Sequence, residues 1–251
     1  PTMYQMLTQA PNWAEADLSS LRFCTSGGAP LPVTLVEQFA REKNVRFKQG
    51  FGMTEFGPGI FALAPEDAIR KAGSIGRPNF FVDARVVDEH NQPLGPNEVG
   101  ELVLKGPSFC SGYFNLPDAM AEVVDEDGWF HTGDMARHDE EWYFYIVDRK
   151  KDMALIGGYN VYPRAVEDVL MEHPAVREVG VAAIPHPNPE KVGQEALKAW
   201  VVLHEGQTVT VDELTAFAAE RLARYEIPSR IEFVQELPRT SVGKILRREL
   251  A

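Results

Sequence analysis

Short apolar runs separated by glycine-rich turns characterise the first part of the chain. An apolar run at 21–25 ends in the glycine-containing segment 26–28, and after Pro32 apolar residues recur at helical spacing. A second β-like run at 45–48 leads into the glycine-rich segment 49–52. Strand, helix and strand in this order predict one βαβ unit of a parallel sheet, whose strand ends are places where ligands bind.

From residue 80 onward the pattern changes to short β-rich segments. Turn residues such as Asn91 and Gly95 separate these segments. The predicted strands cover 81–87, 101–105, 129–132 and 142–147. They predict a small antiparallel sheet or, as we expect, a β-barrel that completes a partial N-terminal domain.

A charged run at 148–152 interrupts this apolar texture, and Gly157-Gly158 follows it. We expect a hinge near Lys151 that divides the chain into domains 1–150 and 151–251. Beyond the hinge, a helix is predicted at 163–172, strands at 176–184, 196–203 and 231–234, and a capping box from Thr210 to Glu213. The fold class is therefore α/β and α+β, with a compact α+β C-terminal domain.

Composition narrows the classes of protein. The 251 residues carry a formal net charge of −12, which argues against a nucleic-acid partner because such partners need clustered Lys and Arg. Cys24 and Cys110 stand far apart without a CxxC pair, so neither zinc nor a disulfide framework is indicated. No apolar run approaches the roughly 20 residues of a membrane-spanning helix. We expect a cytoplasmic protein without an integral membrane segment.

Three segments of the first domain carry candidate chemistry. Gly28 and Ala29 follow a strand, so their backbone can approach a flat ligand, or they form an ordinary tight turn. In 51–55, Phe51 beside Gly52 can stack on a purine, Thr54 can bond a phosphate and Glu55 can bind Mg²⁺; alternatively Thr54 caps a helix. Asp134 after Gly133 can accept hydrogen bonds from a ribose diol, or it ends a strand.

Two cations nearer the C-terminus complete the candidate set. Arg149 can hold ribose or phosphate oxygens, or it belongs to a solvated charge run. Lys244 lies on a glycine-containing turn before basic residues, where one cation can meet a carboxylate and a phosphate as a mixed anhydride forms. The alternative is a solvent-exposed lysine. His131 we assign to packing or to the surface.

Six segments, in this order and spacing, resemble the adenylate-forming superfamily and most closely its fatty acyl-CoA synthetases. They are Ser26-Gly27-Gly28-Ala29-Pro30-Leu31, Gly50-Phe51-Gly52-Met53-Thr54-Glu55, Gly128-Trp129-Phe130-His131-Thr132-Gly133-Asp134, Asp148-Arg149-Lys150-Lys151-Asp152, Gly158-Tyr159-Asn160-Val161-Tyr162-Pro163 and Val242-Gly243-Lys244-Ile245. The resemblance implies ligation of a fatty acid to CoA through acyl-AMP, with ATP, AMP, Mg²⁺ and CoA as cofactors and substrates.

The resemblance also implies residue roles. The backbone of Gly28 and Ala29, with Phe51 and Gly52, would hold adenine, while Thr54 would touch phosphate and Glu55 would hold Mg²⁺. Asp134 and Arg149 would bind the ribose, and Lys244 would act in adenylation. The residues that would serve the CoA step are Gly157, Gly158 and Tyr159. The C-terminal domain would act as a mobile lid that exchanges Lys244 for the Gly157 segment.

Departures from the family pattern are few. Phe51 stands where the family often has Tyr, and Trp142 where a hairpin glycine is common. The family's Ser/Thr/Gly-rich phosphate loop ending in Pro-Lys is not found in these 251 residues, so we expect a C-terminal fragment that is impaired in adenylation by itself. Alternatives are an enzyme that loads a carrier protein and a non-catalytic nucleotide-binding fragment. Acyl chain length stays open, as does the oligomeric state, a homodimer included.

Overall fold

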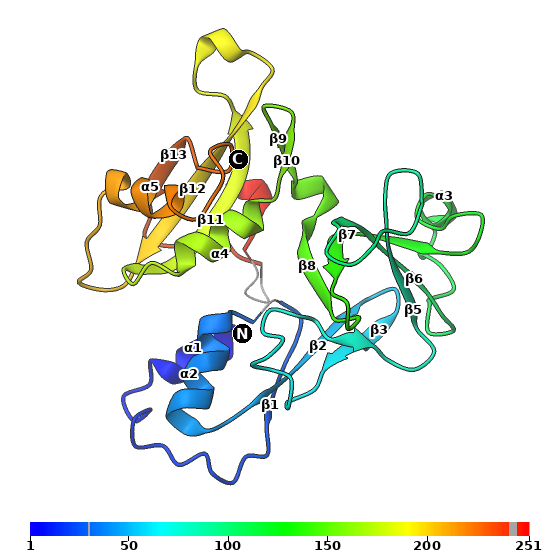
Figure 1. Cartoon of the computed structure of the whole chain (residues 1–251), viewed down its shortest axis with the longest axis horizontal. Helices are drawn as coiled ribbons and strands as arrows, with labels where there is room; N and C mark the ends of the chain where they lie inside the picture. The colour runs from blue at the N-terminus through cyan, green and yellow to red at the C-terminus, as the bar shows by residue number, and fades with distance from the viewer. Residues whose placement is uncertain (30, 241–244, 251) are drawn as a thin grey trace. The chain divides into compact units, whose positions relative to one another are not determined.

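The computed structural model describes residues 1–29, 31–240 and 245–250. They form two compact units, Pro1–Ile146 and Val147–Ala251 (Figure 1). Each unit has its own sheets and its own hydrophobic clusters. The hinge near Lys151 stays a prediction; Lys151 itself lies in the short 3₁₀ turn η1 (Lys150–Asp152).

The first sheet of the N-terminal unit contains the predicted βαβ unit. Its elements are α1 (Thr2–Thr8), β1 (Cys24–Ser26), α2 (Val33–Lys43), β2 (Phe47–Met53), β3 (Gly57–Leu63) and β4 (Arg77–Pro78). β1 and β2 are parallel, with α2 as their connection. Leu35, Val36 and Phe39 of α2 are buried in one cluster with Val45 and Phe47. Periodic apolar residues thus bury one face of the helix against the strands, as the sequence predicted.

β2 is longer than the sequence predicted. The predicted strand ended at residue 48, but 49–52 also lies inside β2 because β3 pairs with it antiparallel, with Gln49 opposite Leu63 and Phe51 opposite Phe61. The alternative in which Thr54 caps a helix is also wrong, since Thr54 lies in the turn between these two strands. The pairing with β3 supplies the hydrogen bonds that a loop would have left to water.

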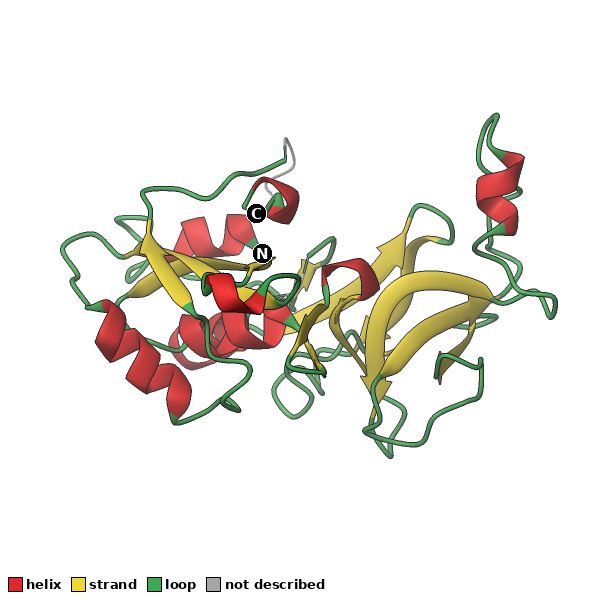
Figure 2. Ribbon diagram, turned by 90° about the horizontal axis from the view of Figure 1, so that it is seen from above, coloured by secondary structure: helices red, strands yellow, loops and turns green. Residues whose placement is uncertain are grey.

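The second sheet of this unit has the strand order β5-β6-β7-β8. The strands are β5 (Asp83–Val87), β6 (Gly100–Lys105), β7 (Phe130–His138) and β8 (Phe144–Arg149), with the short helix α3 (Pro117–Ala121) between β6 and β7. The strands are strongly curved (Figure 2). The expected closed barrel is wrong: in the described residues β5 and β8 are the two ends of the strand order. β8 is instead bridged to Gly76 beside β4, so pairing runs toward the first sheet.

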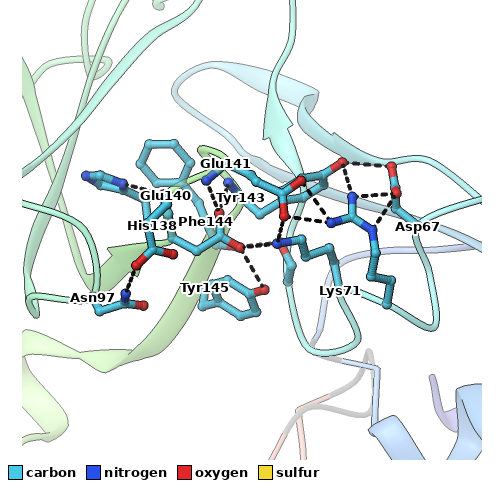
Figure 3. Close-up of polar contacts among 12 residues, drawn as sticks. Asp67, Lys71, Asn97, His138, Glu140, Glu141, Tyr143, Phe144 and Tyr145 are labelled. Atoms are coloured by element: carbon cyan, nitrogen blue, oxygen red, sulfur yellow. Dashed lines mark hydrogen bonds and ion pairs between the residues drawn. The ribbon is translucent and has the colours of Figure 1, made fainter.

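An ion-pair network ties the 64–73 segment to the hairpin between β7 and β8 (Figure 3). Lys71 Nζ lies 2.6 Å from Asp139 Oδ2 and 2.7 Å from Glu141 Oε1. Asp139 Oδ1 accepts from the backbone N–H groups of Glu141 (2.9 Å) and Tyr143 (3.0 Å). One buried carboxylate therefore holds both the tip of the hairpin and a lysine from a distant segment.

Replacing Asp139 by Asn is expected to make stability less dependent on acid. Burial raises the pKa of Asp139, but hydrogen bonds from Lys71 and from the Tyr143 and Glu141 amides outweigh it, so the net pKa is lowered. A lowered carboxyl pKa stabilises the fold above the unfolded value of about 4, and this contribution is lost as pH falls through the folded pKa. In urea titrations, the free energy of unfolding of the wild type should exceed that of Asp139→Asn above about pH 5. This difference in free energy should shrink toward about pH 2. A difference that is constant across this range contradicts the assignment.

The C-terminal unit is a three-stranded sheet with two helices on one face, which confirms its α+β class. Its elements are β9 (Ala154–Ile156), β10 (Tyr159–Val161), α4 (Pro163–Met171), β11 (Val176–Pro185), η2 (Pro189–Lys191), β12 (Glu195–Leu203), α5 (Val211–Ala219), β13 (Arg230–Phe233) and η3 (Arg247–Glu249). Strand order is β11-β12-β13, with β12 and β13 parallel. The predicted capping box at Thr210 and Glu213 is present at the start of α5.

Alternate residues of the strands cover the two faces of this sheet. Val179 and Val181 of β11 pack in one cluster with Leu170 of α4 and Leu214 of α5. Ala182, Trp200, Val202, Leu237 and Leu250 form a separate cluster. The alternation of side chains along a strand thus buries one face under the helices and the other under the C-terminal segment.

Candidate functional site

The turn after β1 presents open backbone. Gly28 has φ +79°, a left-handed conformation that favours glycine, and an added Cβ there would meet no atom within 4 Å. At Gly27, a Cβ would lie 3.1 Å from the Gly50 carbonyl oxygen of the neighbouring strand. Gly28 is exposed and Ala29 half-buried. The predicted close approach of a flat ligand to this turn is compatible with the geometry.

The hairpin of β2 and β3 carries the predicted aromatic and acidic residues. Phe51 is half-buried, and its ring packs edge-on against Phe61 with centroids 5.8 Å apart. Thr54 is exposed in the turn, and Glu55 beside it is half-buried. Tyr113 donates its hydroxyl to Glu55 Oε1 at 2.8 Å, and the Glu55 carbonyl accepts from the Cys110 amide at 2.7 Å. The Glu55 carboxylate is thus held in place by the segment before α3.

Tyr113 is a contact that the sequence did not reveal. Burial and the adjacent Glu55 carboxylate raise the pKa of Tyr113 to about 12, so the phenol stays a donor at neutral pH. Within the described residues, no group of three or more His, Cys, Asp or Glu side chains is arranged to hold a metal ion. A single carboxylate is nevertheless what Mg²⁺ commonly takes from a protein when phosphates supply its other ligands, so Glu55 fits the predicted role.

Gly52 is required by the close approach of the hairpin strands. A Cβ at this position would lie 2.7 Å from the Gly57 carbonyl oxygen and 2.8 Å from the Gly59 nitrogen. Gly52→Ala should therefore displace the turn that holds Glu55 and cost about 1–3 kcal/mol in thermal or chemical unfolding. Gly50→Ala on the same strand is the matched control, because its Cβ would lie 3.7 Å from the Phe61 carbonyl oxygen, an ordinary contact. Equal losses in the two variants would refute this explanation.

Asp134 lies at a bulge in β7. Gly133 has φ +70°, as the sequence predicted for an unusual backbone angle there. The Thr132 hydroxyl donates to the Leu102 carbonyl at 2.7 Å and accepts from the Asp134 amide at 3.0 Å. Glu101 Oε1 accepts from the Gly133 amide at 3.1 Å. The bulge is thus held by two side chains and leaves the half-buried Asp134 at its end.

The remaining predicted residues lie at the end of β8 and on the turn between β9 and β10. Arg149 is the last residue of β8 and is exposed. Gly157 (φ +58°) and Gly158 (φ +89°) form the two-residue turn between β9 and β10, with Ile156 opposite Tyr159. Both positive φ angles fit a type I′ hairpin, and no atom lies within 4 Å of a Cβ added at either glycine. Lys244 lies outside the described residues.

Tyr159 has an aromatic partner that the sequence did not indicate. Its ring, 57% exposed, stacks on Tyr225 with centroids 4.4 Å apart and planes 7° from parallel. Tyr225 follows α5 in a segment without any recognised motif, so only the fold brings the two rings together. Two aromatic side chains, not one, therefore stand beside the glycine turn.

Comparison with known proteins places these elements in a family. Residues 1–114 match the profile described as "AMP-binding enzyme", and residues 165–244 match "AMP-binding enzyme C-terminal domain". The fold is that of adenylate-forming enzymes. The chain belongs to the AMP-binding, adenylate-forming enzyme family, as its motifs predicted.

The similar proteins are ligases. The chain is 44% identical to a feruloyl-CoA synthase of Amycolatopsis sp. over 250 residues, which is 100% of this chain and 50% of that protein. It is also 44% identical to a long-chain-fatty-acid–CoA ligase of Bacillus subtilis, covering 100% of this chain and 44% of the relative. The chain thus spans about half the length of the curated relatives it matches.

A solved structure shows the same fold with ligands. The o-succinylbenzoate CoA synthetase of Bacillus subtilis in complex with its acyl-adenylate intermediate superposes with a TM-score of 0.85 at 37% identity, over 99% of this chain and 49% of that one. The same synthetase is also known with ATP and a magnesium ion, at a TM-score of 0.85 and 36% identity, over 99% of this chain and 50% of that one. Of the helices in the described parts of our chain, none has the length and apolar character that crossing a membrane requires.

Proposed function

We propose that the protein containing this chain is an AMP-forming acyl-CoA ligase, an acid–thiol ligase. A carboxylate oxygen attacks the α-phosphorus of ATP, which gives acyl-AMP and releases pyrophosphate. The CoA thiolate then attacks the acyl carbon, and AMP leaves with the carboxylate oxygen. The observation that carries the proposal is the match over 99% or more of the chain to proteins named as a CoA synthase or as CoA ligases.

The N-terminal unit would hold the nucleotide. The open turn at Gly28 and Ala29 and the Phe51 ring beside Gly52 would bind adenine, and the exposed Thr54 would bond a phosphate. The bulge would aim Asp134 at the ribose hydroxyls. Glu55, oriented by Tyr113, would hold Mg²⁺, which supplies charge neutralisation at the phosphates when bound. These roles agree with what each side chain can donate or accept in its place.

Arg149, at the end of β8, would bind ribose. The C-terminal unit would act in both half-reactions, and its Lys244 would stabilise the charge that spreads as acyl-AMP forms. Gly157, Gly158 and Tyr159 would serve the CoA step, where the two glycines leave the turn without side chains. The exchange between these roles would use a hinge near Lys151.

Two classes of carboxylic acid are candidates for the substrate. We favour a fatty acid. The equal identity, 44%, to a feruloyl-CoA synthase and to a long-chain-fatty-acid–CoA ligase also supports an aromatic hydroxycinnamic acid as a second candidate. Initial rates with a long-chain fatty acid and with ferulic acid at equal concentration decide between them, and a higher kcat/KM for ferulic acid would overturn the first choice.

The acceptor and the setting of the enzyme are part of the proposal. We propose free CoA as the acceptor, a cytoplasmic location and small molecules as the main partners, with a homodimer as the assembly. A phosphopantetheinyl carrier protein that is acylated faster than CoA would favour the carrier-loading alternative. Light scattering of the purified protein decides whether it is a dimer.

The direct test is ATP–pyrophosphate exchange with and without acid. The natural protein that contains these residues should exchange label only when acid is present, and it should form acyl-CoA when CoA is added. The 251-residue chain by itself should exchange far more slowly, because its sequence holds no Ser/Thr/Gly-rich loop ending in Pro-Lys. If that chain binds AMP but the natural protein shows no turnover, the non-catalytic alternative is favoured.

A further inference from the structure

Glu101 is a buried carboxylate beside the candidate ribose-binding residue. It lies in β6, is 8% exposed, and no motif of the sequence pointed to it. Its Oε1 accepts from the Gly133 amide at 3.1 Å, and its Oε2 lies 3.2 Å from His131 Nδ1. A carboxylate is rarely buried unless it is paired and hydrogen-bonded, and Glu101 has both kinds of contact here.

The register of the two strands explains why the bulge needs such a partner. Glu101 pairs with Met135, and the next pair is Val103 with His131. Between these two pairs, β6 has a single residue, Leu102. β7 has three residues there, namely Thr132, Gly133 and Asp134. The backbone groups of these extra residues lose their regular ladder partners. Glu101 supplies an acceptor for the Gly133 amide.

His131 is fixed on both sides of its ring. Its Nε2 lies 3.8 Å from Asp125 Oδ2, and Asp125 Oδ1 accepts from the Trp129 amide at 2.8 Å. His131, assigned from the sequence to packing or surface, thus links two carboxylates and keeps the Glu101 carboxylate turned toward the bulge. The chain of contacts runs from the 125–129 turn through His131 and Glu101 to the residue before Asp134.

We infer that Glu101 is a positioning residue: by holding the Gly133 amide it fixes the bulge of β7 and thereby aims Asp134 at the ribose of the nucleotide. The inference rests on the ribose role of Asp134 given under the proposed function. Glu101 acts through the backbone and does not touch the ligand. It should therefore govern how well the site distinguishes a ribose from a sugar without hydroxyls.

Amide hydrogen exchange of the 251-residue chain tests the hold on the bulge without any ligand. In Glu101→Ala the Gly133 amide should exchange about tenfold faster than in the wild type, because its hydrogen bond to the Glu101 side chain is lost. Glu101→Gln retains an oxygen that can accept and should lie close to the wild type. Glu98→Ala is the matched control, since Glu98 accepts from the Gly95 amide at an exposed turn. Unchanged exchange at Gly133 in Glu101→Ala overturns the inference.

The ratio of affinities for AMP and 2′,3′-dideoxy-AMP tests the aim of Asp134. The wild type should prefer AMP by about tenfold or more, and Asp134→Ala should lower this ratio severalfold toward one, with Arg149 retaining part of the preference. Glu101→Ala should lower the ratio nearly as far as Asp134→Ala does. The variant that combines Glu101→Ala with Asp134→Ala should show no further loss, and Glu98→Ala should leave the ratio unchanged. A wild-type ratio in Glu101→Ala overturns the inference alone. A ratio near one in the wild type overturns the ribose role instead, and Gly133 exchange then decides whether Glu101 holds the bulge.

Discussion

Replacing Lys244 by Ala should slow acyl-AMP formation by about a hundredfold to a thousandfold while thioester formation from supplied acyl-AMP continues. The ammonium group would meet charge that develops only as the carboxylate attacks the α-phosphate. The second half-reaction breaks the acyl–AMP bond and, in the proposed mechanism, uses the Gly157-Gly158-Tyr159 turn. Lys244→Ala should therefore slow the first half-reaction and leave the second largely intact.

The measurement is made in the natural protein that contains these residues. ATP–pyrophosphate exchange reports the first half-reaction, and acyl-CoA formed from synthetic acyl-AMP and CoA reports the second. Lys191→Ala, at an exposed lysine in η2 of the same unit, is the control and should leave both rates unchanged. Equal loss of both half-reactions in Lys244→Ala would remove the role that we give to this residue.

Replacing Arg247 by Met should destabilise the C-terminal unit by about 3 kcal/mol. The Arg247 guanidinium lies 2.6 Å from Asp148 Oδ1 and 2.6 Å from Glu167 Oε2. Burial raises the pKa of Glu167, although Arg247 opposes this effect. Without the guanidinium, the buried Asp148 and the half-buried Glu167 lose their shared cation, and the cost of leaving a buried charge unpaired exceeds the gain from a more apolar side chain.

Arg248→Met is the matched control for this substitution. Arg248 is the next residue of η3 and is exposed, so its loss should change the free energy of unfolding by less than about 0.5 kcal/mol. Chemical denaturation measures both variants when it is followed by tryptophan fluorescence in a protein that retains Trp200, buried in this unit, with Trp13, Trp129 and Trp142 replaced by Phe in all variants. If Arg247→Met and Arg248→Met unfold at the same denaturant concentration, the network does not stabilise the unit.

Local patterns predicted the elements whose cause is local. Apolar residues at helical spacing gave α2, and the capping box at Thr210 gave the start of α5, because both depend on residues a few positions apart. The sequence also pointed to an unusual hairpin at Trp142, which stands at a position where the family pattern has glycine. Trp142 adopts φ +62° where glycine is common in the family, and its ring stacks on His138 with centroids 4.5 Å apart. The stacking offsets part of the cost of that backbone conformation.

Features set by distant segments escaped prediction. The barrel was wrong because closure depends on which strand edges meet, and β8 is bridged to Gly76. The predicted strand stopped at residue 48, before the glycine-rich segment 49–52, yet β2 continues through it because Gly52 allows the close approach of β3. The partners of the candidate site, Tyr113 for Glu55 and Glu101 for Gly133, lie 58 and 32 residues away. No spacing in the sequence indicates such pairs.

Transfer of a carboxylate oxygen tests the central claim most directly. An acid labelled with ¹⁸O at both carboxylate oxygens is incubated with ATP, Mg²⁺, CoA and the natural protein, and the nucleotide and phosphate products are analysed by mass spectrometry. The account predicts acyl-CoA and AMP in equal amounts, with one labelled oxygen in each AMP and none in pyrophosphate. Label in inorganic phosphate together with ADP, or unlabelled AMP beside acyl-CoA, would contradict ligation through an acyl adenylate.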